Sequence, residues 1–168
     1  KIVTELDARP VLLQSKIKIT KETNYKELSD QMSELGAKLI LDTLKLIENR
    51  RANFKEQNES EATYAKKIEK KETKINWNNE AEKIIAKINA FCPYPGCWFE
   101  LNGNRIKIIK AKKVMGKGIP GTILDNNLTI ACSKNAIRIV ELKKESKQKM
   151  TADEFLKGNK IKTGQSLN

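Results

Sequence analysis

The side chains best able to ligate a metal or attack a substrate are few in this sequence. It contains three cysteines, Cys92, Cys97 and Cys132, and no histidine. The Cys92-x4-Cys97 pair supplies two thiols and only one further cysteine exists, so both a four-ligand zinc site and a disulfide framework are disfavoured. The sequence therefore predicts a reduced, cytoplasmic protein without a metal. No apolar run is long enough for a membrane helix, and no membrane partner is expected.

One carboxylate, Asp7, lies in the turn-like stretch 5–10 between two extended segments. Acyl transfer to an amine needs a group that manages protons while a tetrahedral intermediate forms and collapses, and a carboxylate can do this. An aspartate in a turn can also serve the turn alone, with its side chain in solvent. The residue type leaves both interpretations open.

Basic side chains dominate the second part of the chain. The formal net charge is +12, and residues 55–168 carry 23 Lys and Arg against 13 Asp and Glu. Such an excess attracts polyanions through a salt-dependent term that does not read sequence. The alternative is a lysine-rich surface that is merely solvated, and charge alone does not separate the two.

The elements that must position these groups are organised around the stretch 89–100. Pro93 and Pro95 lack a backbone donor and have a restricted φ, so neither a helix nor a central strand continues through them. Gly96 then permits a tight turn. Aromatic residues crowd this corner, and we expect it to plug one end of a small core.

A helix is expected before the corner and strands after it. Ala81, Ile84, Ile85 and Ile88 have helical spacing, and Asn79 is the expected N-cap. The expected strands are 98–101, 105–111, 121–124, 128–131 and 136–142, with a hairpin turn at 102–104. A basic connector, 143–149, leads to a last helix, 152–157, that starts with a capping box. Short strands with one helix favour an open β-barrel of the OB type.

The first part of the chain has a different pattern. Two extended pieces, 2–4 and 11–19, precede an apolar helical stripe that runs from Tyr25 to about Asn49. Gly36 interrupts this stripe, and a close approach to a sheet would explain a glycine there. Residues 50–61 lose all periodicity and are expected to be a linker. By itself this piece would expose a helix face and a sheet edge.

Several motifs resemble the C-terminal half of methionyl-tRNA formyltransferases. They are Ile75-Asn-Trp77, Ala90-Phe-Cys-Pro-Tyr-Pro-Gly96, Thr63-Tyr-Ala-Lys-Lys-Ile68 and an ending with Lys149, Met150, Glu154, Phe155, Leu156 and Gly158. The chain departs from the family pattern at Asn89, where Arg is common, and at Cys92, where Asn is common. The resemblance covers nearly the whole chain and implies that a large N-terminal part of the usual protein is absent.

The resemblance implies an α+β protein with three regions. Residues 1–52 would be the end of a Rossmann-like catalytic domain, 53–72 a linker, and 73–168 an OB-like tRNA-binding domain. Asp7 resembles the family's catalytic aspartate, although Ala8-Arg9 replaces the usual small, glycine-containing pair. The motifs of its Asn and His partners are absent from this sequence, so whether the chain is itself an enzyme stays open.

The activity implied is formyl transfer from 10-formyltetrahydrofolate to the amino group of initiator Met-tRNA in translation initiation. This chain would mainly supply tRNA binding, and whether a separately encoded N-terminal half is a second partner stays open. Charge and strand pattern predict seven RNA contacts: Lys66, Lys67, Arg105, Lys107, Lys110, Lys112 and Lys113. Two alternatives remain, a non-catalytic RNA-binding remnant of a split or decayed gene and a sugar-nucleotide formyltransferase.

Overall fold

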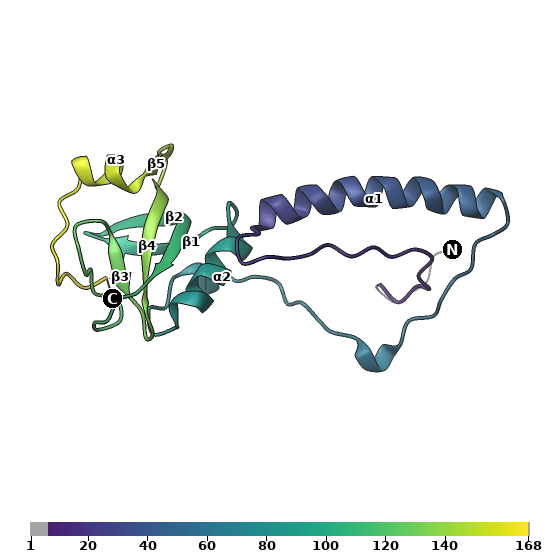
Figure 1. Ribbon diagram of the computed structural model, residues 1–168, viewed down its shortest axis with the longest axis horizontal. Coiled ribbons are helices and arrows are strands. Elements are labelled where there is room, and N and C mark those ends of the chain that lie inside the picture. The colour runs from purple at the N-terminus through teal and green to yellow at the C-terminus, as the bar shows by residue number, and fades with distance from the viewer. Residues whose placement is uncertain (1–6, 168) are drawn as a thin grey trace. The chain divides into compact units, whose positions relative to one another are not determined.

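The computed structural model describes residues 7–167. This part of the chain divides into two compact units, one of residues 7–20 and 27–67 and the other of residues 21–26 and 68–167. The structure combines helices with an antiparallel sheet (Figure 1), as the predicted α+β class requires. The predicted domain boundaries, and the assignment of a Rossmann-like fragment and an OB-like barrel, stay predictions.

The first unit contains most of helix α1, Tyr25–Glu48, and little other regular structure. The helix is the one that the apolar stripe predicts, but none of its residues is buried. Gly36 lies against nothing, since a Cβ added there would have no neighbour within 4 Å. The expected close approach to a sheet is therefore absent at this position.

The predicted strand 11–19 is wrong. Val11 forms a single antiparallel bridge with Lys55, and residues 12–19 contain no strand. An alternating pattern makes a strand only where a partner strand takes up its backbone hydrogen bonds, and here the described residues supply a partner at one position. The predicted strand 2–4 lies outside the described residues. Residues 50–67 are irregular apart from a short 3₁₀ turn at Glu59–Glu61.

The main segment of the second unit, 68–167, starts with a 3₁₀ turn, Lys70–Thr73, and helix α2, Ala81–Phe91. Helix α2 buries Ala81, Ile84 and Ile88, the face that the sequence predicts. Its N-cap is Glu80 rather than Asn79, and no side chain caps it. The carbonyl of Lys134 instead accepts the Ala81 N–H at 3.1 Å, so a neighbouring turn replaces the missing cap.

The proline corner ends α2 and starts the sheet, as predicted. The bonds Cys92–Pro93 and Tyr94–Pro95 are both cis, and Gly96 has φ of +82°. The Gly96 N–H donates to the Phe91 carbonyl at 2.9 Å, which closes the turn. Phe99 is buried, but Tyr94 is 79% exposed, so the corner contributes only part of its aromatic content to the core.

The sheet has five strands. They are β1 Cys97–Leu101, β2 Asn104–Val114, β3 Thr129–Ala131, β4 Ala136–Lys144 and β5 Lys149–Thr151. Their order is β1-β2-β4-β3, and β5 also pairs with β4. The β1–β2 hairpin is confirmed: Leu101 pairs with Asn104, and both turn residues between them have positive φ.

Two strand predictions need correction. Residues 121–124 form no strand, because Thr122 and Ile123 make only isolated bridges, to Ser166 and Ile130. The segment 143–149 is not a simple connector. Strand β4 runs on to Lys144, and β5 begins at Lys149. The sequence missed β5 because three residues are too few to show a period.

Helix α3, Ala152–Lys157, begins with the predicted capping box. The Thr151 hydroxyl accepts the Glu154 N–H at 3.2 Å, and the Glu154 carboxylate accepts the Thr151 N–H at 2.8 Å. Beyond α3 the chain turns back along residues 121–123. There the Leu167 N–H donates to the Gly121 carbonyl at 2.9 Å, and Leu167 is buried in the core.

Buried side chains of α2, the sheet, α3 and the tail form one hydrophobic core. At its centre Trp77 and Phe99 meet edge to face, with ring centroids 5.9 Å apart. Helix α2 packs on β2, β1 and β4, and α3 packs on β4 and β5. Within residues 7–167, no helix is both long enough and apolar enough to cross a bilayer.

Candidate nucleic-acid interface

Strand β2 carries five of the seven predicted RNA contacts. Ile106 and Ile108 are buried on the core side, so Arg105 and Lys107 lie on the outer face of the sheet, as the alternation predicts. The register shifts between Ile108 and Lys110 and again between Lys110 and Ala111. These irregularities place one extra residue first on β2 and then on β4, which changes the alternation along both strands.

Between the two shifts Lys110 pairs with Glu141, and beyond the second shift Lys112 pairs with Arg138. Lys110 and Lys112 are exposed, whereas Ala111 between them packs against the core. Lys110 and Lys112 therefore share the outer face with Arg105 and Lys107. Four of the predicted contacts thus lie along β2 on one face of the sheet.

Lys113 lies on the opposite side of the strand. Its Nζ forms an ion pair with Oε1 of Glu82 on α2. The hydrogen bond from Lys113 lowers the pKa of Glu82 below its usual value. The positive charge of Lys113 is thus already matched, and Lys113 is separated from the other basic groups of β2.

An aromatic stack orders Arg105. The guanidinium carbon of Arg105 lies 4.0 Å from the centre of the Trp98 ring, a cation–π distance. The Trp98 indole N–H donates to the Thr73 hydroxyl at 2.9 Å, which fixes the ring. Lys74 Nζ lies 5.6 Å from the same ring and 3.4 Å from the Glu100 carboxylate. Trp98 is one of the aromatic residues of the stretch 89–100 that the sequence assigned to the core, and the sequence missed this role.

The other predicted site residues lie in the first unit. Lys66 and Lys67 are exposed and belong to no regular element. Asp7 is exposed in a turn with φ of 56°. The Gln57 amide donates to the carbonyls of Asp7 and Arg9 at 2.8 and 2.6 Å, so this turn is held through its backbone. Because Asp7 to Arg9 are all exposed, this turn alone does not enclose a ligand.

Two further basic residues on the outer face were not predicted as contacts. Lys143 pairs directly with Lys107, and Lys149 pairs directly with Lys143. Both fall in the segment that the sequence assigned to a connector. Only the strand register brings them beside Lys107. They could be found from the sequence only if the pairing of β4 with β2 and β5 were already known.

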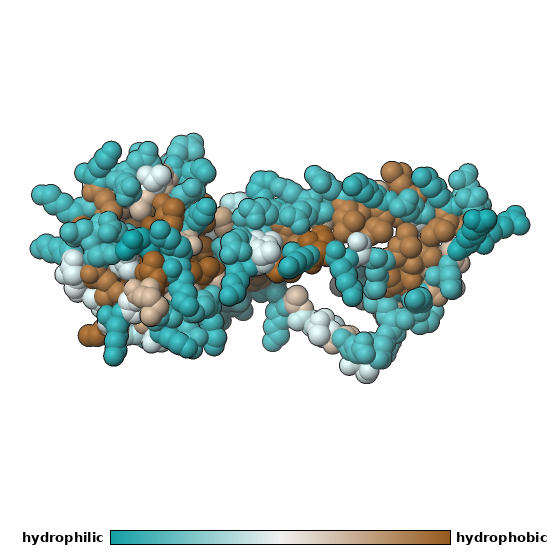
Figure 2. Space-filling view, in the orientation of Figure 1, coloured by the Kyte–Doolittle hydropathy of each residue, from teal (hydrophilic) through white to brown (hydrophobic). Residues whose placement is uncertain are grey.

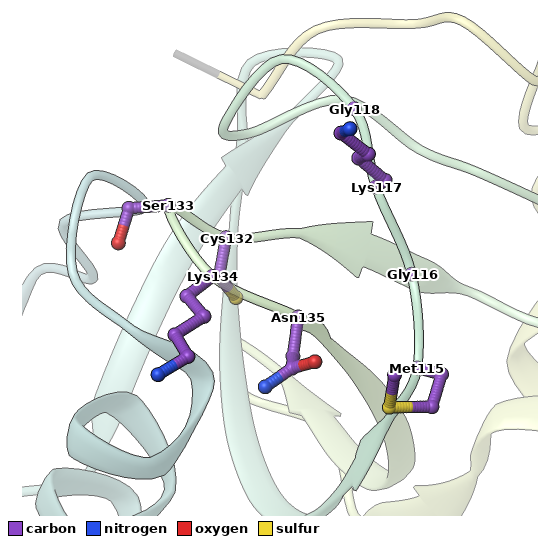
Figure 3. A pocket seen from close by; sticks show the side chains of 8 residues that line it. All are labelled: Met115, Gly116, Lys117, Gly118, Cys132, Ser133, Lys134 and Asn135. Atoms are coloured by element: carbon purple, nitrogen blue, oxygen red, sulfur yellow. The ribbon is translucent and has the colours of Figure 1, made fainter.

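A pocket of about 570 Å³ opens elsewhere in the second unit (Figure 3), between the loop 115–118 and the turn 132–135. The side chains of Met115, Lys117, Lys134 and Asn135 rim it. Gly116 and Gly118 form one wall, and a Cβ at either position would lie within 3 Å of Leu124. No predicted site residue lines this pocket.

The cysteines offer no nucleophile. Burial raises the pKa of Cys97 and of Cys132 to about 11, so both thiols are protonated at neutral pH. Cys92 is buried as well. Among residues 7–167, no cluster of three His, Cys, Asp or Glu side chains is placed to hold a metal ion.

Comparison with known proteins assigns the family. The model of the formyl transferase C-terminal domain matches residues 67–160, more than half of the chain. The chain therefore belongs to the family of formyl transferase C-terminal domains, as its motifs predict.

Curated relatives extend the match over almost the whole chain. The methionyl-tRNA formyltransferase of Bradyrhizobium diazoefficiens is 38% identical over 95% of this chain and 52% of its own length. The enzyme of the same name from Rhodopseudomonas palustris is 37% identical, over 95% of this chain and 53% of its own length. The chain thus spans about half the length of these relatives.

Solved structures of HypX from Aquifex aeolicus share the fold. One variant superposes with a TM-score of 0.71 at 20% identity, covering 96% of this chain and 30% of HypX. The complex of HypX with tetrahydrofolic acid gives a TM-score of 0.70 at 19% identity, covering 97% and 32%. At this identity the likeness shows the fold alone.

Proposed function

We propose that this chain is the C-terminal, tRNA-binding part of a methionyl-tRNA formyltransferase. The complete enzyme would move a formyl group from 10-formyltetrahydrofolate to the amino group of initiator Met-tRNA, in the cytoplasm, during translation initiation. The observation that carries this proposal is the 37–38% identity to methionyl-tRNA formyltransferases over 95% of the chain. The family match over 67–160 supports it independently.

The contribution of this chain would be electrostatic. Four basic residues follow the outer face of β2, and Arg105 among them is ordered by Trp98. Exposed basic groups on one face attract a polyanion and release its counterions, so binding should weaken steeply with salt. The OB-like barrel that the sequence predicts belongs to this proposal as well, since such barrels bind oligonucleotides on a sheet face.

The chemistry would need residues beyond those described. Asp7 is the candidate proton-handling group, but the exposed turn that carries it does not enclose a folate. The described surroundings of Asp7 therefore do not fit the cofactor by themselves, and no catalytic step follows from them. If Asp7 is catalytic, a further folded unit must cover it.

Helix α1 indicates where such a unit would dock. Its apolar side chains gather along the helix (Figure 2), and Ile40, Leu41 and Leu44 are 55–60% exposed. A contiguous apolar face of this kind marks an interaction site. The occupant we propose is the part of the methionyl-tRNA formyltransferases that this chain does not span, joined to it or separate, because the relatives are about twice as long.

The test is formyl transfer to initiator Met-tRNA by this chain alone and mixed with the polypeptide that corresponds to the unmatched half. We expect activity only in the mixture, lost on Asp7→Asn, and salt-sensitive tRNA binding by the chain alone. Leu41→Lys together with Leu44→Lys should prevent the two halves from co-purifying. The proposal fails if the chain binds no tRNA at low salt.

A second candidate is a non-catalytic RNA-binding module. The exposure of Asp7 and its neighbours favours it, since nothing in the described residues assembles a catalytic site around them. The same assay separates the two functions. Salt-sensitive tRNA binding without transfer, alone and in the mixture, identifies the binding module.

A further inference from the structure

Three lysines lie side by side across the outer face of the sheet. Lys107 on β2 pairs directly with Lys143 on β4, and Lys143 pairs directly with Lys149 on β5. Strands β2, β4 and β5 are consecutive neighbours, so these residues form one line perpendicular to the strands. We refer to Lys107, Lys143 and Lys149 as the lysine row. On β1 the row continues to Trp98, which pairs directly with Lys107.

The row costs stability. Neighbouring strands are about 4.8 Å apart, and like charges directly opposite one another on a sheet are destabilising. Among residues 7–167, the ion pair within the row is that of Lys149 with Glu141, at 3.5 Å, and both Lys107 and Lys143 lack one. Two adjacent cations in the row are therefore left without a carboxylate.

The adjacent Lys144 shows what a structural lysine does in this fold. Its Nζ donates to the Asn159 side chain at 2.7 Å and lies 5.2 Å from the centre of the Phe155 ring. Lys144 thus fastens the segment after α3 to the sheet. Lys143, one position earlier on the opposite face, has no such attachment.

The stem of Lys107 lies close to the backbone of Gly96. A Cβ added at Gly96 would lie 2.5 Å from Lys107 Cδ and 2.8 Å from its Cε, so the lysine stem lies across the glycine. Beside this end of the row, Arg105 is held over the Trp98 ring at 4.0 Å. At this end of the row the stem of Lys107 therefore crosses Gly96, and the exposed guanidinium of Arg105 stacks on Trp98.

We infer that the lysine row is a track for an RNA sugar–phosphate backbone that crosses the strands, with the Trp98–Arg105 stack at its end. The inference rests on the proposed function and assigns that function to one face. Lysine ammonium groups act as point charges that phosphates can satisfy one by one. A bound backbone supplies the anions that the sheet itself lacks at Lys107 and Lys143, which explains why a destabilising arrangement is tolerated.

An acidic protein is the competing occupant. Its carboxylates would be interspersed with other side chains, whereas three cations at regular strand spacing match a polymer with one charge per unit. A poly(Glu-Ala) peptide, whose carboxylates are interspersed with apolar side chains, is the probe for this occupant. Binding of this peptide through the row as tight as that of tRNA would overturn the inference in favour of a protein partner.

The experiment uses the whole chain and labelled initiator tRNA, with affinity measured by fluorescence anisotropy across a salt series. The variant is K107Q/K143Q/K149Q. Its matched control is K157Q/K160Q/K162Q, which removes the same charge from exposed lysines of α3 and the tail. We expect the row variant to make the negative slope of log affinity against log salt shallower by about 2–3, since each of three phosphate contacts contributes about 0.7–0.9 to its magnitude. At 0.1 M salt this amounts to about a 100-fold loss, against less than about 3-fold for the control.

Thermal unfolding provides the second readout. Because the lysines of the row repel one another, K107Q/K143Q/K149Q should unfold at a higher temperature than the unmodified chain in low salt, and the difference should vanish in high salt. A variant that binds poorly because it folds poorly would unfold at a lower temperature in both conditions. That result would overturn the assignment of a binding role.

The failures of the two proposals are distinguishable. If the unmodified chain binds tRNA and both triple variants bind alike, the lysine row is solvated surface, and the proposed function stands without it. If the unmodified chain binds no tRNA at low salt, the proposed function fails and the track fails with it.

Discussion

Helices α1 and α2 have the same kind of apolar stripe but differ in how much of it is buried. Helix α1 is 24 residues long and buries none of them. Helix α2 has 11 residues and buries Ala81, Ile84 and Ile88. The difference lies within the units, because α2 packs on three strands of its own unit, whereas the unit that contains most of α1 has no sheet.

The comparison teaches that an amphipathic pattern shows a helix to need an apolar packing partner, but does not show that this partner is present. The apolar face of α2 packs against other residues of the chain, and a continuous core results. The unit that contains most of α1 buries none of this helix, so the stability of α1 rests on its own helix propensity or on a partner outside that unit. The following predictions test this contrast, beginning with the largest expected effect.

Phe99→Ala should cost about 3–5 kcal/mol in the free energy of unfolding of the second unit. Phe99 is 1% exposed and packs edge to face with Trp77, so truncation leaves a cavity in a dense core. Urea unfolding followed by tryptophan fluorescence measures the change. A cost below about 1 kcal/mol would show that this core is loosely packed and would remove the contrast with α1.

Leu167→Ala should cost about 2–4 kcal/mol, although Leu167 lies near the end of the chain. Leu167 is 4% exposed, and its N–H is bonded to the Gly121 carbonyl. The tail therefore belongs to the core rather than to the surface. Lys162→Ala, in the exposed part of the same tail, is the control and should change stability by less than about 0.5 kcal/mol.

Asp125→Asn should lower stability by about 1 kcal/mol at neutral pH, because Asp125 accepts bonds from Thr129 and Arg138 in a partly exposed setting. Burial raises the pKa of Asp125, but hydrogen bonds from Asn127 and Thr129 and the charge of Arg138 outweigh it, so the pKa lies below its usual value.

Because the pKa of Asp125 is lowered in the folded state, the direction in which its contribution to stability changes with pH is fixed. The stabilisation by Asp125 is complete above the unfolded pKa of about 4 and is lost as pH falls through the folded pKa. Unfolding curves between pH 2 and 7 should therefore converge for the parent and Asp125→Asn at acid pH. Curves that stay parallel would mean that the carboxylate charge does not stabilise this turn.

Leu41→Ala in α1 should change the free energy of unfolding by less than about 0.5 kcal/mol. Leu41 is 60% exposed, so little apolar contact is lost, and alanine is the better helix former. Circular dichroism with urea measures the effect on the isolated chain. A cost of 2 kcal/mol or more would show that α1 is packed in solution, by self-association or otherwise.

Sequence patterns predicted the local elements well where a short-range signal was strong. Apolar spacing placed α1 and α2, the box from Thr151 to Glu154 placed α3, and Asn102-Gly103 placed the β1–β2 hairpin. Each of these signals acts within about one turn of chain. The cap of α2 was wrong because the carbonyl of Lys134, far away in sequence, does the work expected of Asn79.

The candidate site was predictable only along a single strand. Alternation placed Arg105 and Lys107 on the outer face, since Ile106 and Ile108 had to face the core. It missed the register shift after Ile108, the stacking of Arg105 on Trp98 and the alignment of Lys143 with Lys107. These features depend on pairing between strands, and pairing leaves no period in any one segment.

By itself the sequence determined the family, the three helices, the hairpin and the basic character of the second part of the chain. The tertiary structure alone decided that 11–19 is not a strand, that β5 exists, and that three lysines lie in one row. The physical reason is the same in each case. Helices and tight turns satisfy their backbone hydrogen bonds locally, whereas strands depend on partners that only the folded chain brings together.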